Sequence, residues 1–210
     1  MDFGNEGRTQ SHRGGFRLLP AALRKSGAMV GLQRFKSTDL LVVNDAVEMA
    51  EELTSNAYKM SFAEWSAQRY DVKTVSDLSP EEIVDGPFAQ IVRYEGRKAE
   101  THLGSSSYDF YKICLQDHSI LSALNKSKEL RLFPFVLYIV CHELVHVIRF
   151  IKFLQSFEAS TEEKLKEESR VHEITRTVLK AAQVSGLEQV FAFYAAWEGD
   201  LDQVRDVRVQ

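Results

Sequence analysis

Apolar residues occupy nearly every position from Leu132 to Phe157, the most apolar stretch of the chain. A helix that is apolar on all of its faces is typical of a protein core, because it has no polar face to turn toward water. Pro134 stands at the start of the stretch, where the first turn of a helix tolerates a residue without a backbone N–H. The pattern therefore predicts a helix buried at the centre of the fold.

Apolar periodicity also predicts a helix earlier in the chain. Four residues repeat at the spacing of one helical face: Ala46, Met49, Ala50 and Leu53. They indicate a helix over residues 44–60, with an extension through residues 62–70 as an alternative. Farther on, Ser79 and Pro80 precede two glutamates, a combination that caps and starts a short helix.

Two segments have the branched and aromatic composition of strands. The first covers residues 88–94 and follows a Gly-Pro pair, and the second covers residues 108–115 and follows a serine-rich loop. Residues 116–119 are expected to turn the chain after the second strand. Because both strands precede the apolar helix, we expect a small sheet packed against it.

Helices are expected again after the apolar stretch. Ser160 and the acidic residues that follow it predict a helix to about Gln183, which Gly186 ends. A last helix is expected over residues 187–197. The predicted fold class is therefore α+β, with a small sheet on the buried helix and a helical C-terminal part.

The composition fits one domain preceded by a basic segment. With 210 residues, of which 44% are hydrophobic, the chain can bury one core, which we assign to residues 38–210. Residues 7–38 hold seven basic residues and no acidic one, whereas residues 39–210 hold 19 basic and 28 acidic residues. We predict that residues 1–37 form a flexible basic tail. A transit-type presequence and an arm that binds nucleic acid, membrane or an acidic partner are the alternatives.

Several classes of protein are disfavoured. Two cysteines are too few for a disulfide framework, which favours the reducing cytoplasm. The apolar stretch is long enough to span a membrane, but it contains five ionisable residues: His142, Glu143, His146, Arg149 and Lys152. No glycine-rich loop has the context of a phosphate-binding motif. We expect a cytoplasmic protein with no membrane span and no nucleotide, in which the basic tail alone has the charge to touch nucleic acid.

The apolar stretch contains the pattern H-E-x-x-H at residues 142–146. Residues four apart lie one turn apart on the same face of a helix, so His142 and His146 can bind one cation together. Glu143 is rotated by about 100° from His142 and can address a water on that cation as a general base. The spacing indicates one Zn²⁺ per chain and a zinc hydrolase.

The motif also has other interpretations. His142 and His146 can be hydrogen-bonded core histidines, with Glu143 paired to Arg149 or to a lysine. Glu143 and His146 also match E-x-x-H, the half-motif of ferritin-like, all-helical metal proteins. Such a site requires a second E-x-x-H, and the candidate pair later in the chain is spaced one residue too far apart. A partner-binding protein without turnover is a further alternative.

A catalytic zinc site has a third protein ligand and leaves a fourth position for water. We expect the apolar helix and the helix after it to form an antiparallel hairpin that turns near Glu158. Residues at equal distances from the turn then lie opposite each other on the two helices. Residue 142 should therefore face about residue 174, and residue 146 about residue 170.

Glu168 and His172 are the candidates for the third ligand, because they lie near the expected level at the edge of the apolar face. In one arrangement Glu168 binds the metal and His172 supports it. In the other, His172 binds the metal and Glu168 accepts its second N–H. The alternative without metal is a surface pair of Glu168 with Arg149.

The order of strand, H-E-x-x-H helix and helix with Glu168 resembles the gluzincin metallopeptidases of the zincin family, especially their minimal forms. The resemblance covers residues 108–183. In that family the second helix carries Glu-x-x-x-Asp, in which the Glu is the third ligand and the Asp braces the first His. Here Glu168 matches the Glu, and His172 stands in place of the Asp.

The resemblance implies a zincin-like fold with Glu168 as the preferred ligand. It also implies that the strand at residues 108–115 is an edge strand, along which a peptide adds backbone hydrogen bonds. The predicted function is a zinc metallopeptidase for a peptide or protein substrate, with Glu143 moving a proton from water to the leaving amine. Tyr194 and His118 are available to stabilise the tetrahedral intermediate, but neither has a distinguishing spacing.

Overall fold

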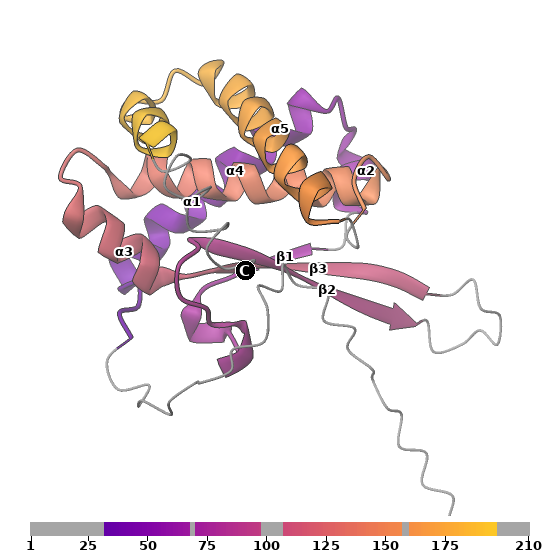
Figure 1. Ribbon diagram of the computed structural model, residues 1–210, viewed down its shortest axis with the longest axis horizontal. Helices are drawn as coiled ribbons and strands as arrows, with labels where there is room; N and C mark the ends of the chain where they lie inside the picture. Colours follow the sequence, from indigo (N-terminus) through magenta and orange to yellow (C-terminus); the bar gives the residue numbers. More distant parts are fainter. Residues whose placement is uncertain (1–31, 68–69, 98–106, 157–159, 197–210) are drawn as a thin grey trace, which may run out of the picture.

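The computed structural model describes residues 32–67, 70–97, 107–156 and 160–196 (Figure 1). Its elements in chain order are α1 (Ser37–Ala57), α2 (Phe62–Ser66), β1 (Tyr70–Lys73), the 3-10 helices η1 (Val75–Asp77) and η2 (Pro80–Glu82), β2 (Ala89–Arg97), β3 (Ser107–Leu115), α3 (Asp117–Lys126), α4 (Leu132–Ile151) and α5 (Thr161–Lys180). A further helical segment covers residues 187–196. The fold is α+β with a three-stranded mixed sheet, which confirms the predicted class at this level and excludes an all-helical bundle. Most of the predicted basic tail lies outside the described residues.

β3 is the central strand of the sheet, whose order is β1-β3-β2. β2 runs antiparallel to β3, with Ala89 opposite Leu115, and β1 runs parallel to β3, with Tyr70 opposite Tyr111. The expectation that residues 108–115 form an edge strand is therefore wrong, because β1 pairs with the second side of β3. The pattern of the sequence missed β1, since its four residues are too few to show a clear alternation.

α4 forms the centre of the core, as its apolar residues predict. It packs against α1, α5 and the sheet, and Figure 1 shows these helices gathered on one side of the strands. Tyr111, Ile113 and Leu115 of β3 are buried in the same core. The ring of Tyr111 stacks on Phe150, with the ring planes 10° apart. The sheet thus contributes directly to the core around α4.

The described part of the chain contains one helix, α4, that is long and apolar enough to cross a membrane, with a mean hydropathy of 1.6. In this protein 89% of that apolar window is buried inside the fold. The core helix of a soluble protein passes the same test of length and composition. Because α4 is buried in the fold, its length and apolar composition are only weak evidence for a membrane span.

The segment after β3 differs from its prediction. Residues 116–119 were expected to form a turn, but Gln116 and Asp117 begin α3. The prediction is wrong because Asp117 has distant partners: its carboxylate accepts the N–H of Phe35 at 2.9 Å and that of Val75 at 3.0 Å. The polar residues Gln116 and Asp117, which suggest a turn in the sequence, are buried where β3 meets α3. Phe35 is itself buried, and α1 begins at Ser37 rather than near residue 44.

Candidate metal centre

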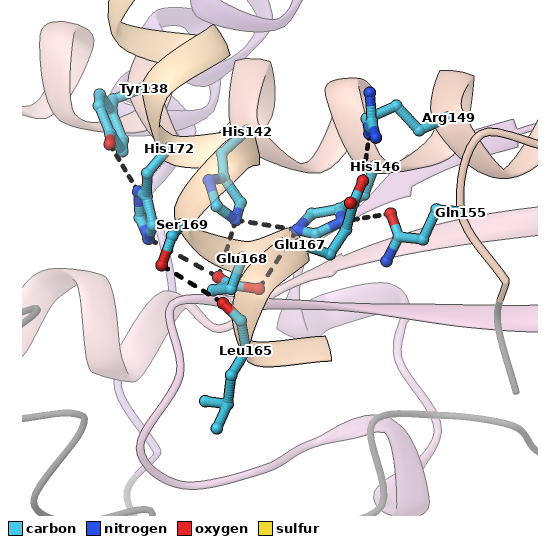
Figure 2. Close-up of polar contacts among 10 residues, drawn as sticks. All are labelled: Tyr138, His142, His146, Arg149, Gln155, Leu165, Glu167, Glu168, Ser169 and His172. Atoms are coloured by element: carbon cyan, nitrogen blue, oxygen red, sulfur yellow. Dashed lines mark hydrogen bonds and ion pairs between the residues drawn. The ribbon is translucent and has the colours of Figure 1, made fainter. Parts of the chain in front are cut away.

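α4 and α5 place the four predicted ligand candidates next to one another. A Ser-Glu capping box starts α5, as the sequence predicts, and the helix packs along α4. His142 and His146 project from consecutive turns of α4, and Glu168 and His172 from consecutive turns of α5 (Figure 2). His142 faces His172, with ring centroids 4.4 Å apart, and His146 contacts Glu168. The antiparallel hairpin predicted residue 174 opposite His142 and residue 170 opposite His146. His172 and Glu168 each lie two residues from these positions.

Donor atoms of three residues converge between the two helices. His142 Nε2 lies 3.1 Å from Glu168 Oε1, His146 Nε2 lies 3.4 Å from Glu168 Oε2, and the two Nε2 atoms are 3.2 Å apart. Donors that bind zinc tetrahedrally at about 2.0–2.1 Å are about 3.3–3.4 Å from one another. This triangle of two imidazole nitrogens and one carboxylate, which offers a different oxygen to each imidazole, has spacings close to those of one face of a tetrahedral zinc site. These residues therefore fit the ion that the motif predicts.

The charges at this triangle depend on one another. Burial raises the pKa of Glu168, but the charges and hydrogen bonds of His142 and His146 outweigh it and hold that pKa well below its usual value. Burial lowers the pKa of His146, but the hydrogen bond and charge of Glu168 reverse the change and raise it. A carboxylate buried among imidazoles thus requires a positive charge between them, which a proton or a metal ion can supply.

Gln155 orients His146 from the turn that follows α4 (Figure 2). Its Oε1 lies 3.2 Å from His146 Nδ1. An amide oxygen only accepts, so Nδ1 donates its proton to Gln155, which leaves Nε2 as the nitrogen that can bind a metal ion or, when protonated, donate to Glu168. Such a hydrogen bond is the usual support of a metal-binding histidine. The sequence analysis missed Gln155, because no motif marks it.

His172 lies beside the triangle and contacts Tyr138 of α4. Its Nδ1 lies 2.7 Å from Tyr138 Oη, and its Nε2 lies 3.6 Å from Glu168 Oε1. Burial, with the charge of His142 in support, lowers the pKa of His172 to about 3, so the ring is neutral. The ligand atoms of His142, Glu168 and His172 all lie within 4.8 Å of one another. This group is wider than the triangle, and the shorter contacts favour Glu168 over His172 as the third ligand.

Glu143 stands next to the triangle without a partner among the described residues. It is half-buried. Burial raises its pKa, the charges of His142 and His146 lower it, and the charge of Glu168 raises it again, with a net rise. No hydrogen bond or ion pair joins Glu143 to Arg149, in contrast to the interpretation of the motif as a paired core carboxylate. Among the described residues, its carboxylate oxygens therefore have no hydrogen-bond or ion-pair partner.

Glu167, the neighbour of Glu168, has different partners. It forms a buried ion pair with Arg149 and a second one with Arg170 at 3.2 Å. Consecutive helical residues point about 100° apart, so Glu167 turns toward Arg149 while Glu168 turns toward the histidines. The alternative in which Glu168 pairs with Arg149 is therefore wrong.

The structure separates the two candidates for stabilising an intermediate. Tyr194, in the segment 187–196, stacks on Tyr138 with ring centroids 4.1 Å apart and lies 5.6 Å from the ring of His172. Burial raises the pKa of Tyr194 well above its usual value, and the charges of Tyr138, Glu143 and Glu168 act in the same direction. His118 lies at the start of α3, 3.5 Å from Asp85. Tyr194 thus borders the site, and the contacts of His118 lie elsewhere.

One feature of the family pattern has no counterpart here. At the position where the gluzincin pattern has an Asp, this chain has His172, whose nitrogens face Tyr138 and Glu168. His142 Nδ1 is buried and has no hydrogen-bond partner among the described residues. Comparisons of the whole chain with protein-family models, with curated proteins and with solved structures found no match.

Proposed function

We propose that this protein is a zinc-dependent hydrolase of the zincin type that cleaves peptide bonds. The observation that carries the proposal is the convergence of two imidazoles and one carboxylate. Glu168 Oε1 lies 3.1 Å from His142 Nε2, Glu168 Oε2 lies 3.4 Å from His146 Nε2, and the two Nε2 atoms are 3.2 Å apart. Three donors at this spacing, two of them on an H-E-x-x-H helix, suit one zinc ion and leave its fourth position open.

Zinc bound there would polarise the scissile carbonyl and make a water acidic enough to attack it. The residues of the chain then supply the rest of the chemistry. Glu143 accepts the proton of the attacking water and returns it to the leaving amine. Tyr194, at the border of the site, can donate its O–H to the developing oxyanion.

The topology suggests where a peptide would lie. β3 is paired on both sides, so among the described strands β2 and β1 form the edges of the sheet. β2 contacts α4, is nine residues long and has one unpaired side. We therefore propose β2, in place of β3, as the strand along which a peptide adds backbone hydrogen bonds.

The substitution Glu143→Gln tests this function. The variant should bind one zinc per chain, as measured by elemental analysis of protein purified without added metal, but should no longer cleave a library of unstructured, fluorescence-quenched peptides. Arg170→Gln is the matched control, because Arg170 lies two residues from Glu168 on α5 but its side chain is 61% exposed and pairs with Glu167. A Glu143→Gln protein with the activity of the wild type would refute the assigned role.

Two further outcomes distinguish the alternatives. Bound zinc in the absence of any cleavage would favour a metal-dependent binding protein without turnover. Two irons per chain would favour the ferritin-like interpretation, although the three-stranded sheet and the spacing of Glu168 and His172 speak against it.

A further inference from the structure

Three of the four large apolar side chains that are exposed in the described structure lie at one end of the molecule. Phe62 is 87% exposed, Phe153 95% and Leu154 53%. Phe62 begins α2, the other two follow α4, and Figure 1 shows α2 beside the C-terminal end of α4. Lys59 and Lys152, both exposed, stand close to them in the chain. We call these five residues the end patch.

Charge interactions confirm that the two halves of the end patch are neighbours. Hydrogen bonds from Ser61 lower the pKa of Glu64, and the charge of Lys152 lowers it further. Burial raises the pKa of Tyr58, and the nearby guanidinium of Arg149 opposes that rise. The turn after α1, the start of α2 and the end of α4 therefore lie together.

The backbone at Phe153 is in a conformation that side chains rarely adopt. Its φ is 54°, in the left-handed region. Its N–H donates to the Phe150 carbonyl at 3.1 Å, and the N–H of Leu154 donates to the Arg149 carbonyl at 2.8 Å. This pattern ends a helix, and glycine is preferred at the left-handed position because it has no Cβ to clash.

Phe153 is thus unfavourable to the fold in two ways. Its backbone is strained relative to glycine, and its ring is 95% exposed, so packing within the protein does not offset the strain. The left-handed backbone alone does not mark a function, since Gln183 shares it, but at Phe153 it coincides with a 95% exposed aromatic ring. An exposed aromatic ring that is held in this way points to a partner outside the chain.

We propose that the end patch docks this protein on an anionic membrane surface, with Phe62, Phe153 and Leu154 entering the boundary between head groups and acyl chains. These side chains protrude, and a bilayer accepts protruding rings without a complementary pocket, which a folded partner would need. Lys59 and Lys152 complement the negative charge of the head groups, and together with the exposed Glu64 beside Lys152 they leave one net positive charge. Aromatic residues beside lysines are the composition of interfacial anchors.

The end patch is also connected to the candidate metal centre. Gln155 follows Leu154 directly and contacts His146. Docking would therefore hold the metal centre close to the lipid surface. The proposal does not depend on zinc or on hydrolysis, so its test can fail while the proposed function holds, and the reverse.

The test is sedimentation of the full-length protein with vesicles of phosphatidylcholine alone and of phosphatidylcholine mixed with phosphatidylserine. The wild type should bind the mixed vesicles more strongly than the neutral ones. Phe153→Gly should weaken this binding about tenfold, because one ring no longer leaves water. Its thermal unfolding midpoint should equal or exceed that of the wild type, because glycine relieves the left-handed strain.

Gln183→Gly is the matched control, since Gln183 is also left-handed, with a φ of 48°, and lies outside the end patch. It should gain similar stability and keep full vesicle binding. Phe62→Ser provides a second variant on another element and should weaken binding to a similar degree. Absence of binding by the wild type would overturn the proposal. So would unchanged binding by both Phe variants, which would assign any binding to the basic residues 7–38.

Discussion

Two glutamates in this protein, the buried Glu82 and the half-buried Glu168, differ in where their positive charge comes from. Glu82, below the sheet, lies 2.8 Å from Lys112 Nζ and accepts hydrogen bonds from the hydroxyl of Tyr94 and the N–H of Ser79. Glu168, between α4 and α5, faces the imidazoles of His142 and His146, and its charge and hydrogen bond raise the pKa of His146. The first cluster carries its own permanent cation, and the second does not.

The difference shows how a structural cluster can be distinguished from a binding site. A buried carboxylate with a lysine and neutral donors is complete, and nothing further is needed to stabilise it. A carboxylate that converges with two nitrogen lone pairs has an unmet need for a cation. The comparison can be tested by removing the cation from the first cluster and by adding one to the second.

The largest effect is expected from Lys112→Met. This substitution leaves Glu82 buried without its cation, so the free energy of unfolding at pH 7 should fall by about 3–5 kcal/mol. Urea unfolding measures it. The double variant with Glu82→Gln should recover much of the loss, and a double variant that is no more stable than the single one would show that the ion pair is not responsible.

Acid should weaken the same cluster. Burial raises the pKa of Glu82, but hydrogen bonds from Lys112, Tyr94 and Ser79 outweigh it and lower the pKa to about 2, below the ordinary value of 4.5. The stability from this group is therefore present above pH 4.5 and is lost as the pH falls toward 2. The loss should be roughly 3 kcal/mol. The free energies of unfolding of the wild type and of Glu82→Gln, plotted against pH, should converge over this interval. Parallel pH dependences would contradict the assignment.

Zinc should act on the other cluster alone. At a free concentration one hundred times its Kd, zinc should raise the free energy of unfolding by about 2.7 kcal/mol, because only the folded chain presents the three donors. His146→Ala should abolish this gain, whereas Glu82→Gln should retain it. Unfolding in zinc and in a chelator measures the difference, and a gain that survives in His146→Ala would place the ion elsewhere.

The smallest effect concerns the support of one ligand. Gln155→Ala removes the acceptor of His146 Nδ1–H. Zinc affinity should fall about tenfold, equivalent to about 1.4 kcal/mol, since the ring loses its fixed tautomer. A competition titration with a zinc indicator measures it. Ser156→Ala, at the next residue, should leave the affinity unchanged, and equal losses in both variants would point to a general effect on the turn.

The candidate ligands were largely predictable because they depend on local geometry. A helix places residues four apart on one face, so His142 and His146 follow from their spacing. Glu168 and His172 required one further assumption, a short antiparallel hairpin, and that assumption predicted the facing positions to within two residues. The supporting residues were not predictable. Tyr138 and Gln155 carry no motif, and their roles depend on which ring nitrogen each one reaches.

The sheet shows the same limit on a larger scale. β2 and β3 were predicted from their composition, since strand-forming residues show in short windows. β1 was not, and neither was the central place of β3, because parallel pairing joins segments about forty residues apart and leaves no local pattern. The start of α3 was mistaken for a turn for the same reason, since Asp117 has its hydrogen-bond partners in distant segments.

The sequence by itself determined the buried helix, its H-E-x-x-H face and the α+β class, because hydrophobic periodicity and helix geometry act over a few residues. The tertiary structure alone decided which of two adjacent glutamates meets the histidines and which meets Arg149. It also decided which strand is left with a free edge and that Phe62 and Phe153 remain exposed. These outcomes depend on how segments far apart in the chain pack together, and such contacts leave no local pattern in the sequence.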